Sequence, residues 1–438
     1  MPERPRRSWL GSILATLLIL AVLITLGGAA TTVLVARGSH SEPSVTFVEN
    51  AGTDGRVAAL RALLDRRAKA VLAKDKAAFL ADVDNTDAAV LRKQEELFAN
   101  LTVLPLAEFS YQLEERVNFD TRLTPAQQAR YHSLVRTAGV TVRYRIDGLD
   151  EKAVATPWVP VFGVVDGAWR VAGELTDAKG LPMGANGQPW DAGAIKVVRS
   201  NRVLAVLSAD DAGRSSGLLT MAETGVDRVL AVRPGGWPGK VLLTAVQDSK
   251  IFEAYFTDSP DRVSQVAAVA VPYYSQVPAW HTSATYTATR VVFNPQQLGG
   301  AADAELLHDL THEFTHVAMG PVTVGATPLW LVEGFAEYVA FKPEQVRPQY
   351  LRSVLSQVKP GLPENKDYYA DALHYVVSWQ ACKMIAERYG EAKLMALYEA
   401  FQTTSNMDAT LKRILGVDLA TLTTDVDAYV AQARASAN

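Results

Sequence analysis

The sequence predicts an α+β protein in three parts: an N-terminal transmembrane helix, an α+β domain of cone-like shape, and a second domain with a mixed sheet and a C-terminal helical subdomain. Three observations support this organisation. Residues 9–36 form an uncharged, mostly apolar run. In residues 55–190, apolar residues first recur at helical spacing and then alternate along the chain with a period of two, as in strands. Residues 195–435 first alternate strand and helix patterns and then continue as helices alone.

The composition excludes several classes of protein. A chain of 438 residues is long enough for two or three domains. Its net charge of −4, without a basic stripe, gives no basis for binding nucleic acid. The single cysteine, Cys382, excludes an internal disulfide and a zinc site built from cysteines.

The run at residues 9–36 predicts a membrane anchor. As a helix rising ~1.5 Å per residue, it is long enough to cross ~30 Å of hydrocarbon. A cleaved signal peptide has a shorter apolar core of about 7–15 residues, although a Gly-Gly-Ala-Ala stretch keeps cleavage open as an alternative. Three arginines precede the run, so we expect residues 1–8 in the cytoplasm and the bulk of a single-pass membrane protein outside. Residues 37–54 then read as a linker.

The first domain, residues 55–190, begins with helices and ends with strands. Helical spacing predicts helices at 57–72, 76–83 and 88–100. Alternation then predicts strands that include residues 109–113 and 140–144. Asp166-Gly167 lies between two apolar runs and predicts a tight hairpin turn.

This order, with the hairpin near its end, resembles the nuclear transport factor 2-like fold. Such domains enclose a small-molecule pocket or serve as structural and dimerisation modules. No polar constellation in this stretch indicates a site, and the oligomeric state stays open. The acidic residues of its helical part are expected to form a solvated face: Asp84, Asp87, Glu95 and Glu96.

The second domain, residues 195–435, follows a Gly- and Pro-rich boundary at 181–192. It begins with a β-α-β-α-β-β unit. The expected strands are 203–207, 240–246, 267–271 and 289–293, and the expected helices are 210–232 and 248–256.

A helix at 304–319, with Asp303 as N-cap, carries the sequence His312-Glu313-Phe314-Thr315-His316. Residues four apart lie on one helix face, so His312 and His316 can hold one cation between them. Glu313 lies beside that cation, where it can act as a general base. The spacing is typical of a catalytic Zn²⁺ site.

A second helix supplies a third ligand. Thr327 is the expected cap, Pro328 the first helical residue, and Glu333 lies within the helix. A helix joined to the first by a short turn runs back beside it, which returns Glu333 to the two imidazoles. Three ligands leave a fourth zinc position open, as in catalytic rather than structural sites.

These two segments, H-E-F-T-H and W-L-V-E-G-F-A-E-Y, resemble the gluzincin pattern. The resemblance is closest to peptidase MA-like zincins and more distant to the aminopeptidase N family. It implies a zincin fold, with Glu333 as the third zinc ligand. Glu337, one turn on, lies on the same face and either supports a ligand or forms a surface salt bridge. Gluzincins commonly use a tyrosine as oxyanion donor, which we expect to be Tyr375, with Tyr369 as the alternative.

The amine-binding segment of aminopeptidase N enzymes, G-x-M-E-N, is missing upstream of His312. Residues 290–295 occupy roughly its place and could form an edge strand to which a peptide adds. This departure favours an endopeptidase. The remaining chain reads as helices at 368–389, capped by Asp367, and at 392–401, 408–415 and 419–438.

The sequence therefore predicts a membrane-anchored, extracytoplasmic zinc metallopeptidase with a peptide or protein substrate. Two alternatives remain: a degenerate zincin that acts as a binding or scaffold protein, and a zinc amidase acting on cell-wall material. The zinc motif does not name the substrate, because specificity lies in the shape of the pocket.

Overall fold

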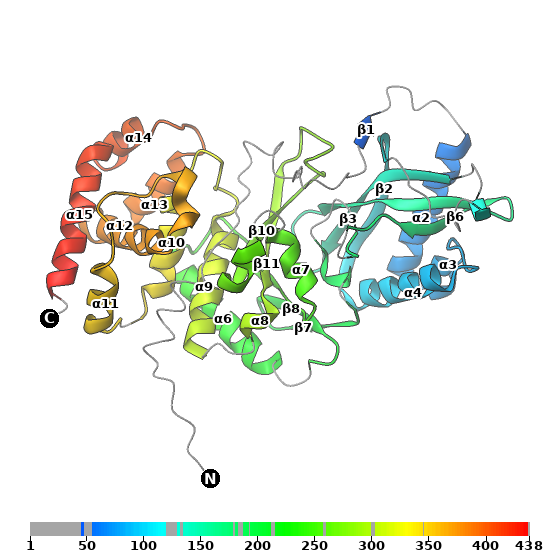
Figure 1. Cartoon of the computed structure of the whole chain (residues 1–438), viewed down its shortest axis with the longest axis horizontal. Helices are drawn as coiled ribbons and strands as arrows, with labels where there is room; N and C mark the ends of the chain where they lie inside the picture. The colour runs from blue at the N-terminus through cyan, green and yellow to red at the C-terminus, as the bar shows by residue number, and fades with distance from the viewer. Residues whose placement is uncertain are drawn as a thin grey trace, which may run out of the picture.

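The computed structural model describes residues 45–47, 55–119, 129–131, 135–177, 180–182, 187–191, 193–211, 215–256, 260–298, 303–344 and 346–436. Figure 1 shows an elongated molecule with the N-terminal α+β part at one end, a sheet with flanking helices in the middle, and a helical part at the other end. The α+β class predicted from the sequence is confirmed.

The N-terminal part packs helices against a curved antiparallel sheet. Its helices are α2 (Gly55–Ala73), α3 (Lys76–Leu80) and α4 (Ala88–Val103). Its strands are β1 (Val45–Phe47), β2 (Leu106–Phe119), β3 (Val135–Ile146), β4 (Val154–Trp158), β5 (Pro160–Val165) and β6 (Ala168–Glu174). The turn between β5 and β6 has positive φ at both Asp166 (50°) and Gly167 (76°), as a two-residue hairpin turn needs.

One acidic residue of this part contradicts the predicted solvated face. Asp84 is only 1% exposed and accepts hydrogen bonds from the hydroxyls of Thr86 and Tyr131. Asp87 instead caps α4 by accepting from the backbone N–H of Ala89. The sequence could not separate the two, because the partner Tyr131 is distant along the chain.

The middle part continues the same sheet. Its strands are β7 (Ile195–Arg199), β8 (Val203–Ser208), β9 (Val241–Ala245), β10 (Ala268–Tyr274) and β11 (Tyr286–Phe293), in the order β10-β11-β9-β8-β7. Helix α6 (Ser215–Val232) connects β8 to β9, α7 (Ser249–Glu253) lies between β9 and β10, and α8 (Pro295–Leu298) follows β11. The predicted β-α-β-α-β-β order is present, although α6 begins later than the expected residue 210.

A single residue pair, Tyr274 with Ala155, joins β10 to β4 and so connects the N-terminal and middle parts of the sheet. Nearby, Arg290 of β11 forms a buried ion pair with Asp150 at 2.9 Å. The predicted edge strand at 290–295 is wrong, because β11 pairs with β10 on one side and with β9 on the other.

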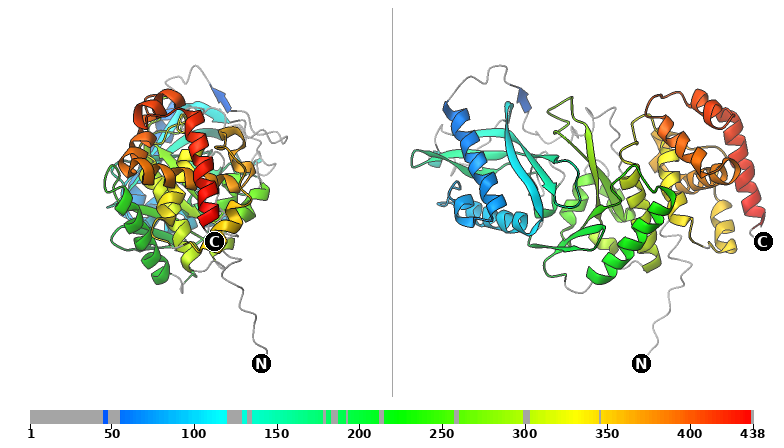
Figure 2. Two further views of the ribbon diagram at one scale, coloured as in Figure 1. Left: turned by 90° about the vertical axis from the view of Figure 1, so that its left-hand side faces the viewer. Right: turned by 180° about the vertical axis from the view of Figure 1, so that it is seen from behind.

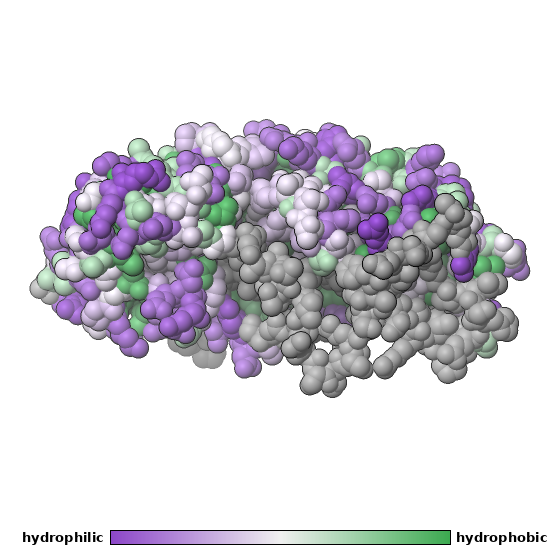
Figure 3. Space-filling model, turned by 90° about the horizontal axis from the view of Figure 1, so that it is seen from above, coloured by the Kyte–Doolittle hydropathy of each residue, from purple (hydrophilic) through white to green (hydrophobic). Residues whose placement is uncertain are grey.

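The helical part contains α9 (Asp303–Met319), α10 (Leu329–Phe341), α11 (Pro348–Leu355), the short 3₁₀ helix η4 (Asn365–Ala370), α12 (Leu373–Tyr389), α13 (Glu391–Ala400), α14 (Met407–Ile414) and α15 (Leu419–Ser436). Figure 2 shows α9 between the sheet and the remaining helices. Over the C-terminal helices, the face in Figure 3 is mostly hydrophilic with small, separate hydrophobic spots.

Three predicted caps differ from the structure. Asp303 is the first residue of α9 and lies within its first turn. Thr327 does not cap α10, since its hydroxyl accepts from the backbone N–H of Val324, while Asn365 accepts from Leu329. Asp367 lies within η4, and Asp371 instead accepts from the N–H of Leu373 at the start of α12.

The predicted membrane segment, residues 9–36, lies outside the described residues. Within the described part of the chain, no helix combines the length and the apolar character needed to cross a bilayer.

Candidate metal centre

Helix α9 lies with one face against the sheet layer and the other toward α10. Leu310 and Phe314 belong to the core that α9 shares with α6, β9 and β11. The helical spacing that turns these residues inward places His312, Glu313 and His316 toward α10. All three are nearly inaccessible to solvent, at 0%, 0% and 3% exposed.

Three side chains from α9 and α10 point donor atoms at one position. The Nε2 atoms of His312 and His316 are 3.0 Å apart. Oε2 of Glu333 lies 3.4 Å from the first and 3.5 Å from the second. Ligands held tetrahedrally at ~2.0–2.1 Å from zinc are about 3.3 Å apart. The three donors therefore fit a zinc ion with one position left open.

The unsatisfied polar atoms also fit a cation. Oε2 of Glu333 is buried and has no hydrogen-bond partner within the described ranges. Two imidazole nitrogens facing each other at 3.0 Å are reasonable when both lone pairs point at a shared positive charge. Burial alone would raise the pKa of Glu333, but the imidazoles of His316 and His312 outweigh it and lower that pKa.

A second carboxylate supports the first histidine from behind. Oε1 of Glu337 lies 3.3 Å from Nδ1 of His312, and its Oε2 lies 3.2 Å from Nε2 of His308. Burial opposes ionisation of Glu337, but its contacts with the two histidines lower its pKa to about 2. A carboxylate on the far nitrogen of a metal-binding histidine fixes the ring orientation. Of the two roles considered for Glu337, the geometry favours support of a ligand over a surface salt bridge, because Glu337 is 0% exposed.

Glu313 has no partner among the described residues. Both of its carboxylate oxygens are buried and make no hydrogen bond. Burial, helped by the nearby negative charges of Glu333, Asp309 and Glu337, raises the pKa of Glu313 to about 8. A carboxylate in such surroundings binds a proton readily, as a general base must.

Three tyrosines lie beside the donors. The hydroxyl of Tyr369 donates to Oε1 of Glu333 at 3.1 Å. The ring centroid of Tyr375 is 6.5 Å from that of His312, and its buried hydroxyl has no partner among the described residues. The Tyr368 hydroxyl donates instead to Ser378. Burial raises the pKa of the Tyr375 hydroxyl well above its usual value, so the hydroxyl stays protonated and able to donate.

Tyr369 is the most exposed of the three tyrosines. It is only partly buried, whereas Tyr368 and Tyr375 are 0% and 2% exposed. The guanidinium of Arg262, in the 3₁₀ helix Pro260–Gln265, lies 4.7 Å from the centre of the Tyr369 ring. This contact and the bond to Glu333 were not predicted, because no local pattern connects Arg262 with Tyr369.

The structure thus places each predicted site residue in one cluster: the three donors, Glu313 beside them, and both candidate tyrosines within the same shell. His308 and His374 have structural partners. His308 contacts Glu337, and Nδ1 of His374 lies 2.7 Å from the backbone oxygen of Tyr368.

Comparison with known proteins gives a family match. Residues 273–432, which contain all of these side chains, match the Peptidase MA superfamily. No curated protein matches the chain.

Solved structures with some similarity include an M1 zinc metallopeptidase from Deinococcus radiodurans, at 14% identity and a TM-score of 0.32. A mutant two-domain M1 zinc metallopeptidase bound to L-arginine has 13% identity and the same TM-score. In both, the match covers 68% of this chain and 61% of the other. At that TM-score the likeness carries no argument about this chain.

The family match indicates Zn²⁺ as the cofactor, and the donor set fits it. The nuclear transport factor 2-like resemblance of the first domain stays a prediction. The match of residues 273–432 to the Peptidase MA superfamily confirms the resemblance to gluzincin-type peptidases that the sequence predicts.

Proposed function

We propose that the chain is a zinc-dependent peptidase that hydrolyses peptide amide bonds, with His312, His316 and Glu333 as the metal ligands. The observation that carries this proposal is the convergence of three buried donors beside a carboxylate, Glu313, that has no hydrogen-bond partner in the described part of the chain. A purely structural site has four protein ligands and needs no such base.

The reaction follows from the positions of the side chains. Bound Zn²⁺ supplies a Lewis acid that polarises the scissile carbonyl and activates water. Glu313 accepts the proton of the attacking water and later delivers it to the leaving amine. Glu337 holds the His312 ring in place throughout, because it contacts the ring nitrogen that faces away from the donors.

Tyr375 is the proposed donor to the oxygen on which negative charge develops. Its hydroxyl has no hydrogen-bond partner among the residues that the structure describes, whereas the hydroxyl of Tyr369 is already bonded to Glu333. One such donor typically accelerates a reaction by about 10²–10³-fold. Tyr369 then holds Glu333 in position instead of contacting the substrate.

We further propose that the enzyme is an endopeptidase anchored in the cell membrane by residues 9–36, with its catalytic part outside the cytoplasm. The sequence supports the anchor through the uncharged run and the preceding arginines. The missing amine-binding segment supports endopeptidase action. Protease digestion of intact and of permeabilised cells tests the orientation: an external catalytic part is cut in both, and a cytoplasmic one only after permeabilisation.

Incubating the full chain with casein and with peptidoglycan fragments tests the reaction. We expect casein to be cleaved by the wild type and not by Glu313→Gln. Cleavage of peptidoglycan fragments alone would identify the amidase instead. If both proteins bind casein and neither cleaves it, the domain is a binding protein.

A further inference from the structure

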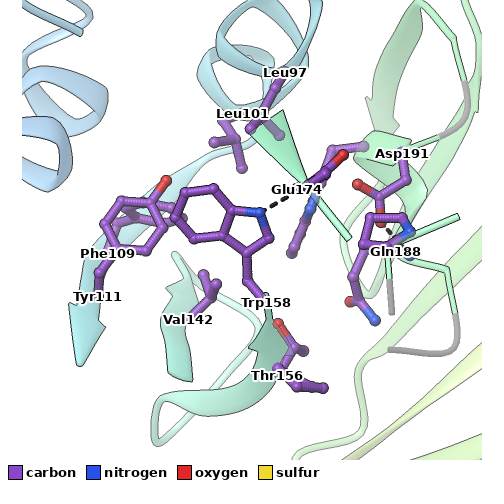
Figure 4. A pocket seen from close by; sticks show the side chains of 13 residues that line it. Leu97, Leu101, Phe109, Tyr111, Val142, Thr156, Trp158, Glu174, Gln188 and Asp191 are labelled. Carbon is purple, nitrogen blue, oxygen red and sulfur yellow. Dashed lines mark hydrogen bonds between the residues drawn. The ribbon is translucent and has the colours of Figure 1, made fainter. Parts of the chain in front are cut away.

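The N-terminal part contains a cavity that the peptidase reaction does not use. Figure 4 shows it between α4 and the concave side of the sheet, closed on one side by the segment around the 3₁₀ helix Pro189–Asp191. The empty space, including its open mouth, is about 420 Å³. Its lining combines an apolar wall with a few polar groups, as small-molecule sites do.

One side of the cavity is aromatic. Trp158 of β4 packs against Tyr111 of β2, with ring centroids 5.3 Å apart. Phe109 contacts Tyr111 edge-on at 5.0 Å, and Trp190 closes the wall from the adjacent segment. The electron-rich faces of such rings attract cations. The guanidinium of Arg67 already lies over the Trp158 ring, 5.9 Å from its centre.

The other side is acidic. Glu174 of β6 accepts a hydrogen bond from the indole N–H of Trp158 at 2.8 Å. Asp191 lies beyond it and accepts from the backbone N–H of Gln188 at 2.9 Å. Thr156 is 3% exposed and lines the same space, and no described residue bonds to its hydroxyl. The cavity therefore offers one hydroxyl and two carboxylates to an occupant.

Among the described residues, no cation forms an ion pair with Asp191. Lys93 pairs with Glu174. Arg67, behind the aromatic wall, is bonded to the backbone oxygen of Phe79 and to the side chain of Gln94. Burial, together with the charge of Glu174, raises the pKa of Asp191 to about 7. A positive charge placed in the cavity would relieve this repulsion.

We propose that this cavity binds a small organic ammonium ion, with its nitrogen next to Asp191 and its carbon groups against Trp158 and Trp190. The aromatic faces and the unpaired carboxylate both favour a cation, whereas an anion would meet two carboxylates. The site lies in a different part of the fold from the metal centre, so it stands whether or not the chain is a peptidase.

Isothermal titration of the full chain with n-butylammonium, n-butanol and butanoate tests the proposal. We expect n-butylammonium to bind with a dissociation constant at least about tenfold lower than that of n-butanol, and butanoate not to bind. Equal binding of the amine and the alcohol would overturn the proposal, as would absence of amine binding by the folded protein at tens of millimolar.

Two variants locate the site. Asp191→Asn keeps the size of the side chain and an acceptor for Gln188, and it should weaken n-butylammonium binding about tenfold or more. The matched control is Glu95→Gln on the outer side of α4, where Glu95 is 41% exposed and pairs with Lys76. Glu95→Gln should bind as the wild type does. If Asp191→Asn melts as a folded protein and binds the amine unchanged, the assignment is wrong.

Discussion

Gly334 lies directly against the backbone of Ser378, where helices α10 and α12 pack. A Cβ atom at Gly334 would be 2.3 Å from the carbonyl oxygen of Ser378 and 2.9 Å from Sγ of Cys382. Only glycine allows this approach, because any side chain would push the two helices apart. Glu333 is the preceding residue, so the same contact fixes the position of the third metal ligand.

Gly334→Ala should therefore both destabilise the protein and loosen the metal site. Overpacking against a backbone atom costs about 1–3 kcal/mol, measurable as a lower free energy of unfolding in urea. Zinc affinity should fall in the same variant, because Glu333 moves with α10. Gly217 in α6 is a matched control: a Cβ there meets nothing within 4 Å. Gly217→Ala should leave zinc affinity unchanged and stabilise the helix by up to ~1 kcal/mol.

Glu337→Gln should weaken zinc binding by about 10–100-fold, the usual effect of removing a carboxylate behind a metal-binding histidine. Competition with a chelator of known affinity measures the change. Glu344→Gln is the control, since Glu344 lies 3.6 Å from His308 and does not contact His312. Equal zinc affinities for the two variants would show that Glu337 does not support the ligand.

The two tyrosines should give different kinetic signatures. Tyr375→Phe removes only a hydroxyl that has no protein partner, so we expect kcat to fall by about 10²–10³-fold with normal zinc content. Tyr369→Phe removes the bond to Glu333, so its main effect should be on zinc affinity. The reverse pattern would make Tyr369 the oxyanion donor.

Asp191 should make stability depend on pH. An unfolded aspartate has a pKa of about 3.9, and the folded value is about 7. Below the lower pKa the carboxyl is protonated in both the folded and the unfolded state, so it does not change the free energy of unfolding. Between the two values the unfolded chain loses the proton first, so the free energy of unfolding falls as pH rises, and the loss is complete above about pH 7.

Urea unfolding at several pH values between 4 and 8 checks this. Asp191→Asn should match the wild type at pH 4 and be more stable at pH 8. The gain is at most a few kcal/mol, since one pKa unit corresponds to ~1.4 kcal/mol and the side chain is partly exposed. A constant difference across this range would contradict the burial of an ionised Asp191.

The metal cluster was predictable because its pattern is local. His312, Glu313 and His316 follow from helical spacing, and Glu333 follows from a second helix after a short turn. Most helices and strands also follow from periodicity, as α2, β8 and α9 illustrate.

What the sequence missed depends on contacts between distant segments. The side chain of Asn365 accepts the hydrogen bond from the Leu329 N–H. The strand that contains Arg290 and Phe293 pairs with β9, so it is not an edge strand. The cavity brings Trp158, Glu174 and Asp191 together from separate elements. None of these contacts produces a periodic pattern in the sequence. The cavity in the first domain could therefore be recognised only from the folded structure.

The central claim is that His312, His316 and Glu333 hold a zinc ion that Glu313 uses for catalysis. Metal analysis of the purified full chain, run with a casein assay on the same samples, tests it most directly. We predict about one zinc per chain in the wild type and in Glu313→Gln, little or none in His312→Ala, and casein cleavage by the wild type alone. A wild type that holds no zinc, or a Glu313→Gln variant that cleaves casein at the wild-type rate, would contradict the account.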